Sequence, residues 1–164
     1  IGLAVVSLVV LLALSAGGYV AAAHLTGGAY PTPGLALGGD RGELRRTSLS
    51  FLEDVQFKDF ETAASYHRPE VQDQVDIPYL LERLFVQKPE LLDILDYEVV
   101  SADVDSSGNR GRVRMRVALK DLATGIARNQ EFMLFYQREA PGEPWFMELE
   151  SSLRHLEGEA GKKH

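Results

Sequence analysis

The sequence contains no cysteine among its 164 residues. This absence excludes disulfide bonds, catalytic thiols, cysteine-ligated metals and attachment of a lipid to a cysteine. It does not decide the compartment, because an oxidising compartment permits disulfides without requiring them.

The sequence also lacks the short motifs that bind nucleotides or build a hydrolase site. It has no glycine-rich phosphate loop, no dinucleotide-binding glycine fingerprint and no Gly-x-Ser-x-Gly turn. Its four histidines, His24, His67, His155 and His164, are not spaced as metal ligands are. We therefore predict no metal or other cofactor. The net charge of −7, from 24 acidic and 17 basic residues, also argues against a nucleic-acid partner.

Charge is absent from the first 23 residues, Ile1 to Ala23. An apolar run of about 18 residues or more is long enough to cross a bilayer as a helix. We therefore predict an N-terminal transmembrane helix over residues 1–24. The alternative is a cleaved secretory signal ending in Val20-Ala21-Ala22-Ala23, but the run is longer than the apolar region typical of such signals. Because the sequence begins with isoleucine rather than methionine, we expect a short segment before it.

The placement of basic residues predicts the orientation. Between His24 and Gly39 there is no lysine or arginine, and the first basic residue is Arg41. Cytoplasmic flanks of membrane spans collect positive charge. We therefore expect a single-pass protein of the bacterial inner membrane, with its C-terminal domain in the periplasm.

Composition divides the remainder into three segments. Residues 25–39 are rich in glycine and proline without a helical or alternating period, which is typical of a linker. Residues 40–155 are long enough for one domain with a core of its own. Residues 156–164 form a polar tail.

The first part of this domain is expected to be helical. Asp40 and Glu43 resemble a capping box at the start of the first helix. Asp59 is expected to cap a second helix that ends before Pro69, and Asp76 a third, while Pro89 begins one further short turn. The side chains expected to be buried are Leu44, Phe51, Leu52 and Val55 in the first helix, Phe60, Ala63, Ala64 and His67 in the second, and Leu80, Leu81, Leu84 and Phe85 in the third.

From Tyr97 the apolar period changes from helical to two, which indicates strands. The expected strands are Tyr97–Val104, Gly111–Leu119, Ala127–Arg138 and Trp145–Ser151. Short connections containing glycine or proline separate them, as hairpins require. We therefore predict an α+β fold, with about three helices packed on a curved four-stranded antiparallel sheet.

Two stretches carry a resemblance to a known family. The second helix reads Asp59-Phe60-Glu61-Thr62-Ala63-Ala64-Ser65-Tyr66, and the final strand contains Trp145-Phe146-Met147-Glu148. Between about Glu43 and Leu153 the order of elements resembles the NTF2-like fold (SnoaL and ketosteroid-isomerase type). The resemblance implies a sheet wrapped around helices as a cone. With the N-terminal span, the layout is similar to bitopic bacterial proteins that include assembly factors of secretion systems.

Some members of that superfamily are isomerases, so the resemblance raises the possibility of an isomerase site in this chain. An isomerase-type site needs a carboxylate base opposite hydroxyl donors inside an apolar cavity. The candidates are Tyr66, Tyr79, Asp96, Tyr97, Asp103 and Tyr136. Their spacing places no base opposite a donor, and the catalytic positions of the family cannot be matched to them. We therefore predict that the protein is not an enzyme. We expect the cone to be filled by Phe51, Leu52, Leu84, Phe132, Leu134 and Trp145.

Two features suggest binding surfaces instead. Arg112, Arg114 and Arg116 alternate with apolar residues, so they share one face of a strand. This face either binds an acidic partner or is a solvated surface whose arginines pair with Glu98 and Glu131. In the apolar run, Ala13, Gly17 and Ala21 recur every four residues, a spacing that lets a second helix approach closely in lipid.

These features together predict a membrane-anchored accessory or assembly subunit of a larger membrane complex. It would bind other subunits through helix–helix packing in the bilayer and through the NTF2-like domain. Two alternatives stay open: a membrane-tethered small-molecule binder or isomerase, and a homodimer formed through the sheet face.

Overall fold

The computed structural model describes residues 38–160, with side chains up to residue 156. The chain divides into two compact units, Ile1–Glu43 and Leu44–His164. Of the first unit the described part is only the start of a helix, so the predicted span and most of the predicted linker lie outside the described residues. Among the helices of residues 38–160, none has both the length and the apolar character needed to cross a bilayer.

Helix α2, Gly39–Gln56, is the longest helix of the described residues. It begins one residue before the predicted cap, so Asp40 lies in its first turn. Its apolar stripe is buried as predicted, and Leu44, Phe51 and Leu52 have no exposed surface. These residues recur at i, i+7 and i+8, which brings them onto one side of the helix.

Helix α3, Phe60–Ala64, begins at the predicted cap, where Asp59 Oδ1 accepts from the Thr62 N–H at 3.1 Å. The sequence predicted that this helix continues until Pro69, but it ends at Ala64. The Ser65 hydroxyl donates to the Thr62 carbonyl at 2.6 Å, and such local bonds compete with helix propagation. His67 therefore lies in the loop that follows the helix. A short 3-10 turn, η1, covers Gln72–Gln74.

Helix α4, Ile77–Phe85, confirms the third predicted helix and its start. Asp76 Oδ1 accepts from the Tyr79 N–H at 2.9 Å, and Pro78 occupies the first turn. The helix ends at Val86, whose φ of 53° is left-handed. The predicted apolar side of this helix is buried. The short turn predicted at Pro89 is also present, as η2, Pro89–Leu91.

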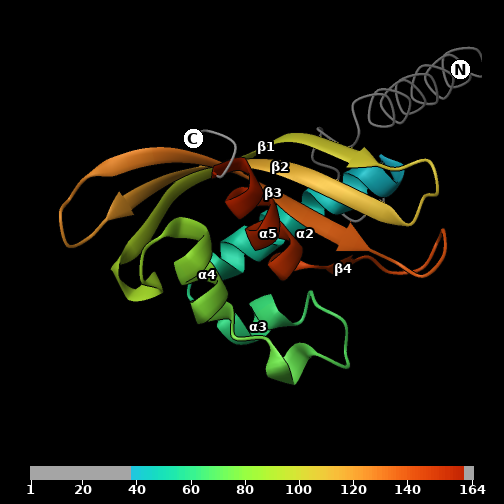
Figure 1. Cartoon of the computed structure of the whole chain (residues 1–164), viewed down its shortest axis with the longest axis horizontal. Helices are drawn as coiled ribbons and strands as arrows, with labels where there is room; N and C mark the ends of the chain where they lie inside the picture. The colour runs from blue at the N-terminus through green and yellow to red at the C-terminus, as the bar shows by residue number, and fades with distance from the viewer. Residues whose placement is uncertain (1–37, 161–164) are drawn as a thin grey trace, which may run out of the picture. The chain divides into compact units, whose positions relative to one another are not determined.

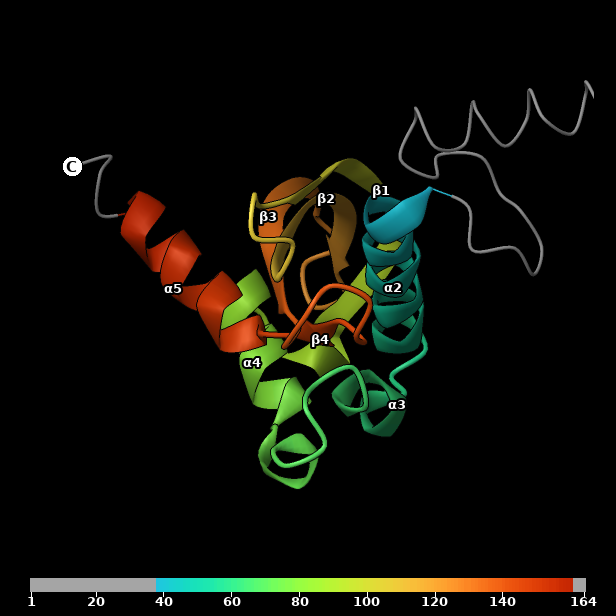
Figure 2. The ribbon, with the colours of Figure 1, turned by 90° about the vertical axis from the view of Figure 1, so that its right-hand side faces the viewer.

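Four antiparallel strands follow in the order β1-β2-β3-β4 (Figure 1), so the predicted α+β class is confirmed. They are β1 Leu92–Val104, β2 Arg110–Asp121, β3 Ala127–Gln137 and β4 Phe146–Met147. Strand β1 starts five residues earlier than predicted. Its pairing with β2 shifts register twice, and such irregularities bend a strand. Figure 2 shows the curved sheet between α2 and α5, with α3 and α4 below it.

The fourth predicted strand is wrong in its second half. Only Phe146 and Met147 form β4, and Leu149–Ala160 is helix α5, which extends into the segment assigned to a polar tail. Trp145, Met147 and Leu149 alternate as in a strand. However, Leu149, Leu153 and Leu156 also recur at helical spacing, and the longer pattern prevails.

The core lies between the helices and the inner face of the sheet. It contains all six residues predicted for it: Phe51, Leu52, Leu84, Phe132, Leu134 and Trp145. Helix α2 lies along the β1 side of the sheet and α4 beneath the β3 side (Figure 2). Where α2 crosses the start of β2, a Cβ atom at Gly111 would lie 2.6 Å from Leu44 Cδ1, so glycine permits this close approach.

A buried arginine closes one end of this core. Arg138 is 3% exposed, and its Nε donates to the Gly108 carbonyl at 2.7 Å in the β1–β2 turn. Its guanidinium carbon lies 4.1 Å from the centroid of the Trp145 ring, an arrangement typical of a cation–π contact. Arg138 and Trp145 therefore hold the turn against the chain that leads into β4.

Candidate functional site

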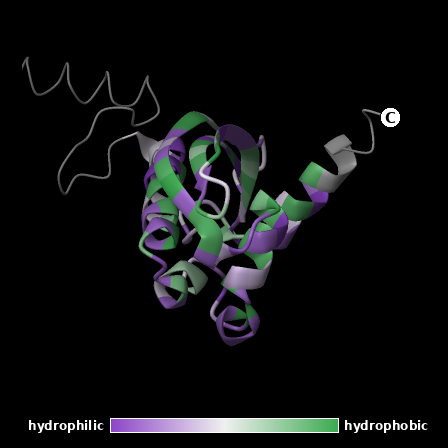
Figure 3. Ribbon diagram, turned by 90° about the vertical axis from the view of Figure 1, so that its left-hand side faces the viewer, coloured by the Kyte–Doolittle hydropathy of each residue, from purple (hydrophilic) through white to green (hydrophobic). Residues whose placement is uncertain are grey.

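The outer face of the sheet contains the predicted arginine row. On β2, Arg112, Arg114 and Arg116 are exposed, whereas the valine and methionine residues between them are buried. This alternation confirms the predicted division of the strand into two faces. Hydrophilic and hydrophobic residues are interleaved in the same way through the domain (Figure 3).

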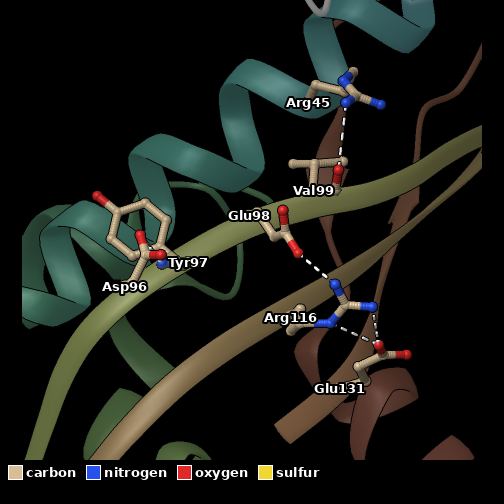
Figure 4. Close-up of polar contacts among 7 residues, drawn as sticks. All are labelled: Arg45, Asp96, Tyr97, Glu98, Val99, Arg116 and Glu131. Carbon is tan, nitrogen blue, oxygen red and sulfur yellow. Dashed lines mark hydrogen bonds and ion pairs between the residues drawn. The ribbon is translucent and has the colours of Figure 1, made fainter. Parts of the chain in front are cut away.

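Arg116 is paired on both sides by acidic residues of the neighbouring strands. Its Nη1 lies 2.5 Å from Glu98 Oε1 on β1, and its Nη2 lies 2.7 Å from Glu131 Oε1 on β3 (Figure 4). These hydrogen bonds, to Glu131 first and then Glu98, raise the pKa of the Arg116 guanidinium. Both predicted partners are therefore present, and the charge of Arg116 is matched within the domain.

Arg112 is also paired, but more weakly. Its Nε lies 3.6 Å from Asp103 Oδ2, and the two residues are directly opposite in the β1–β2 register. Both side chains are about half exposed, so solvent screens the pair. Asp103 thus points outward, away from the core.

Arg114 is the exception in this row. Its cross-strand neighbours are Ser101 on β1 and Met133 on β3, neither of which carries charge. Among the described residues, no ion pair or hydrogen bond of its guanidinium is present. Among the described residues, Arg114 is therefore the member of the row with no acidic partner.

A shallow groove of about 170 Å³ lies beside Arg114. Arg114, Glu131, Phe132, Met133, His155 and Leu156 line this groove. Helix α5 forms its far wall, and His155 packs against Phe135 of β3 with ring centroids 5.5 Å apart. The groove thus brings the basic Arg114 and the acidic Glu131 together with side chains of Phe132, Met133 and Leu156.

The interior of the domain contains polar groups that bond to one another. The Tyr136 and Ser48 hydroxyl oxygens are 2.7 Å apart, and burial raises the pKa of Tyr136. The Tyr66 hydroxyl donates to Asp54 at 2.9 Å, and burial followed by this bond raises its pKa to about 12. Neither Ser48 nor Asp54 was among the candidate site residues proposed from the sequence. Ser48 could have been found, because it interrupts the apolar stripe of α2 at a core position.

Neither candidate carboxylate lies next to a tyrosine hydroxyl in the interior of the domain. Asp96 is exposed and accepts from the Tyr97 main-chain N–H at 2.9 Å, and Asp103 pairs with Arg112 on the outer face. A depression of about 560 Å³ borders Asp103, but it is open at the surface. Asp96 and Asp103 therefore do not form the buried base with an opposing donor that an isomerase needs.

His67 is buried in the loop after α3. Burial lowers its pKa, and its Nδ1 lies 3.3 Å from the Ala64 carbonyl. Within residues 38–156, His67 Nε2 has no hydrogen-bond partner, and no three His, Asp or Glu side chains are grouped as metal ligands would be. The second predicted surface, Ala13, Gly17 and Ala21, lies outside the described residues.

Comparisons with known proteins do not identify a family or a function for this chain. No protein-family model matches the chain, and no curated protein matches it. A search of solved structures finds the intermembrane space region of the chloroplast protein ARC6, at 17% identity and a TM-score of 0.29, covering 63% of this chain and 91% of that one. A TM-score this low does not identify a shared fold. The function proposed for this chain therefore rests on its own residues alone.

Proposed function

We propose that this protein is a non-catalytic, membrane-anchored accessory or assembly subunit of a larger membrane complex. The uncharged run Ile1 to Ala23 would be the anchor, and the domain from Leu44 onward would be an NTF2-like module in the periplasm. Helices that precede an antiparallel sheet and pack inside its curve support this family. The C-terminal helix α5, in place of a full fourth strand, departs from the expected pattern.

The availability of Arg114 is the observation that carries the docking role. Within the arginine row the charges of Arg112 and Arg116 are matched by acidic neighbours, whereas Arg114 faces Ser101 and Met133. A partner that presents a carboxylate would complement the charge of Arg114. The interior favours binding over catalysis, since large apolar residues fill it.

Charge reversal at Arg114 tests this role. The full chain would be affinity-purified from its native membrane in mild detergent, and the co-purifying subunits would be identified and quantified. We expect Arg114→Glu to reduce their recovery at least about tenfold, as expected when like charges are placed across an interface. Lys88→Glu changes the net charge equally at an exposed site remote from this face, and should retain the partners. Equal recovery with both variants would exclude the outer face as the docking surface.

Protease accessibility tests the orientation independently. Protease added to cells stripped of their outer membrane should digest the domain while the inner membrane stays intact. A cytoplasmic control protein must survive the treatment. Complete protection of the domain would place it in the cytoplasm and overturn the proposed location.

A further inference from the structure

The fold closes one outer edge of the sheet. Along β1, three main-chain carbonyls accept hydrogen bonds from side chains of α2 and of the turn that follows it. The donors and acceptors are Arg45 to Val99 at 3.3 Å, Gln56 to Ile94 at 2.6 Å, and Lys58 to Leu92 at 2.9 Å. Figure 4 shows the first of these bonds. An edge whose carbonyls are occupied in this way cannot pair readily with another strand.

The opposite edge belongs to β3, and two hydrogen bonds establish which of its groups face outward. The Arg138 N–H donates to Asn109 on the β2 side at 3.0 Å, and the Glu148 N–H donates to the Phe135 carbonyl on the β4 side at 2.8 Å. Main-chain groups alternate between the two sides of a strand. The odd-numbered residues of β3 therefore direct their N–H and C=O groups away from β2. Strand β4 pairs only with the last two residues of β3.

The first five residues of β3 form an open edge. Ala127, Asn129 and Glu131 are exposed, and no hydrogen bond among residues 38–160 uses their outward main-chain groups. The β2–β3 turn bounds this stretch at Ile126. At the other end, Met133 lines the groove against α5. Unpaired groups in such a row are a template for another strand.

We propose that this open edge is a homodimer interface. In it, β3 of a second copy pairs antiparallel with β3, with the two Asn129 residues directly opposite each other. Ala127 then lies opposite Glu131, and Arg128 opposite Gln130. The pairing adds about six main-chain hydrogen bonds and joins the two sheets into one. This interface differs from face-to-face packing, because the outer faces of both sheets stay accessible.

In this register a second copy sets no like charges opposite each other. Centring the pair on Arg128 or on Glu131 would set two like charges directly opposite each other, which destabilises a sheet. Centring it on Asn129 sets none. Beside the edge, Ile126 is 66% exposed although it is apolar. In the same register Ile126 of one copy lies opposite Phe132 of the other, next to the groove that Met133 and Leu156 line.

The absence of cysteine makes the register directly testable. Asn129→Cys in the full chain, solubilised in mild detergent, introduces the only thiol. Opposed residues of a hydrogen-bonded pair have Cα atoms about 5.5 Å apart, within the range of a disulfide. Mild oxidation should therefore give a covalent dimer. Val100→Cys, exposed on the closed β1 edge, is the matched control and should stay monomeric under the same conditions. Equal cross-linking of the two variants would overturn the proposal.

A proline variant tests the same edge without a cross-link. Because the Asn129 N–H faces outward, Asn129→Pro removes no hydrogen bond within the domain. It should weaken dimerisation at least about tenfold by sedimentation velocity, since it removes two symmetric hydrogen bonds. Unchanged circular dichroism would show that the domain stays folded. If Asn129→Pro instead unfolds it, the cysteine experiment still decides. A chain that is monomeric at all concentrations, or a dimer insensitive to Asn129→Pro, contradicts the interface.

Discussion

The hydroxyl oxygens of Ser48 and Tyr136 lie 2.7 Å apart inside the domain and join helix α2 to strand β3. The two residues are separated by 88 positions in the chain, and both side chains are buried. The bond fixes the depth at which α2 lies in the curve of the sheet. It also satisfies two groups that would otherwise be costly to bury.

Removing one partner of this bond should destabilise the domain. Tyr136→Phe leaves the Ser48 hydroxyl buried without its partner, and we expect the free energy of unfolding to fall by about 1–3 kcal/mol. Urea denaturation followed by circular dichroism measures the change. The double variant Ser48→Ala/Tyr136→Phe should lose less than the sum of the two single variants. Strict additivity would mean that the bond contributes little.

Stability should decrease at alkaline pH because of Tyr66. Its folded pKa is about 12, raised from the ordinary tyrosine value of 10.0, so the folded state holds this proton more tightly than the unfolded state. The contribution is complete below pH 10 and is lost as pH rises from 10 toward 12. The ring is partly exposed, so screening should keep the effect below about 1 kcal/mol. Tyr66→Phe should show a smaller decrease between pH 9 and pH 11 in urea titrations. An identical decrease would exclude Tyr66 as its source.

The close approach of Leu44 to Gly111 predicts a compensating pair of substitutions. Gly111→Ala places a methyl group 2.6 Å from Leu44 Cδ1 in a packed core, and should cost about 1–3 kcal/mol. Leu44→Val shortens the opposing side chain. The double variant should therefore be more stable than the sum of the single variants predicts, when thermal unfolding is measured. Failure of Leu44→Val to rescue Gly111→Ala would indicate that the clash is relieved elsewhere.

A larger side chain on the predicted membrane helix should weaken assembly. Gly17→Leu fills the face made by Ala13, Gly17 and Ala21, which would prevent a partner helix from approaching closely. We expect reduced recovery of the partner subunits from detergent extracts. Leu11→Ile, a change of similar chemistry outside the small-residue face, serves as the control. Unchanged recovery with Gly17→Leu would assign assembly to the domain from Leu44 onward or to another helix face.

Local patterns in the sequence were enough for much of the domain. The caps at Asp59 and Asp76, the buried side of α4 and the two faces of β2 all match the structure. Each depends on residues a few positions apart, where backbone geometry determines which side chains share a surface. The uncharged run Ile1 to Ala23 is also a local pattern, and the proposed membrane anchor is based on it.

The structure decided what depends on distant residues. Trp145–Ser151 satisfies the strand period and the helix period at once, and packing against α4 and β3 selects a helix from Leu149. Glu98 and Glu131 reach Arg116 rather than Arg114 because of the register of β1 and β3, which no local pattern determines. The closed edge of β1 and the open edge of β3 likewise follow from the placement of α2 and α5. Side-chain identity therefore determines the elements and their faces, whereas register and packing determine which charges and which strand edge stay available.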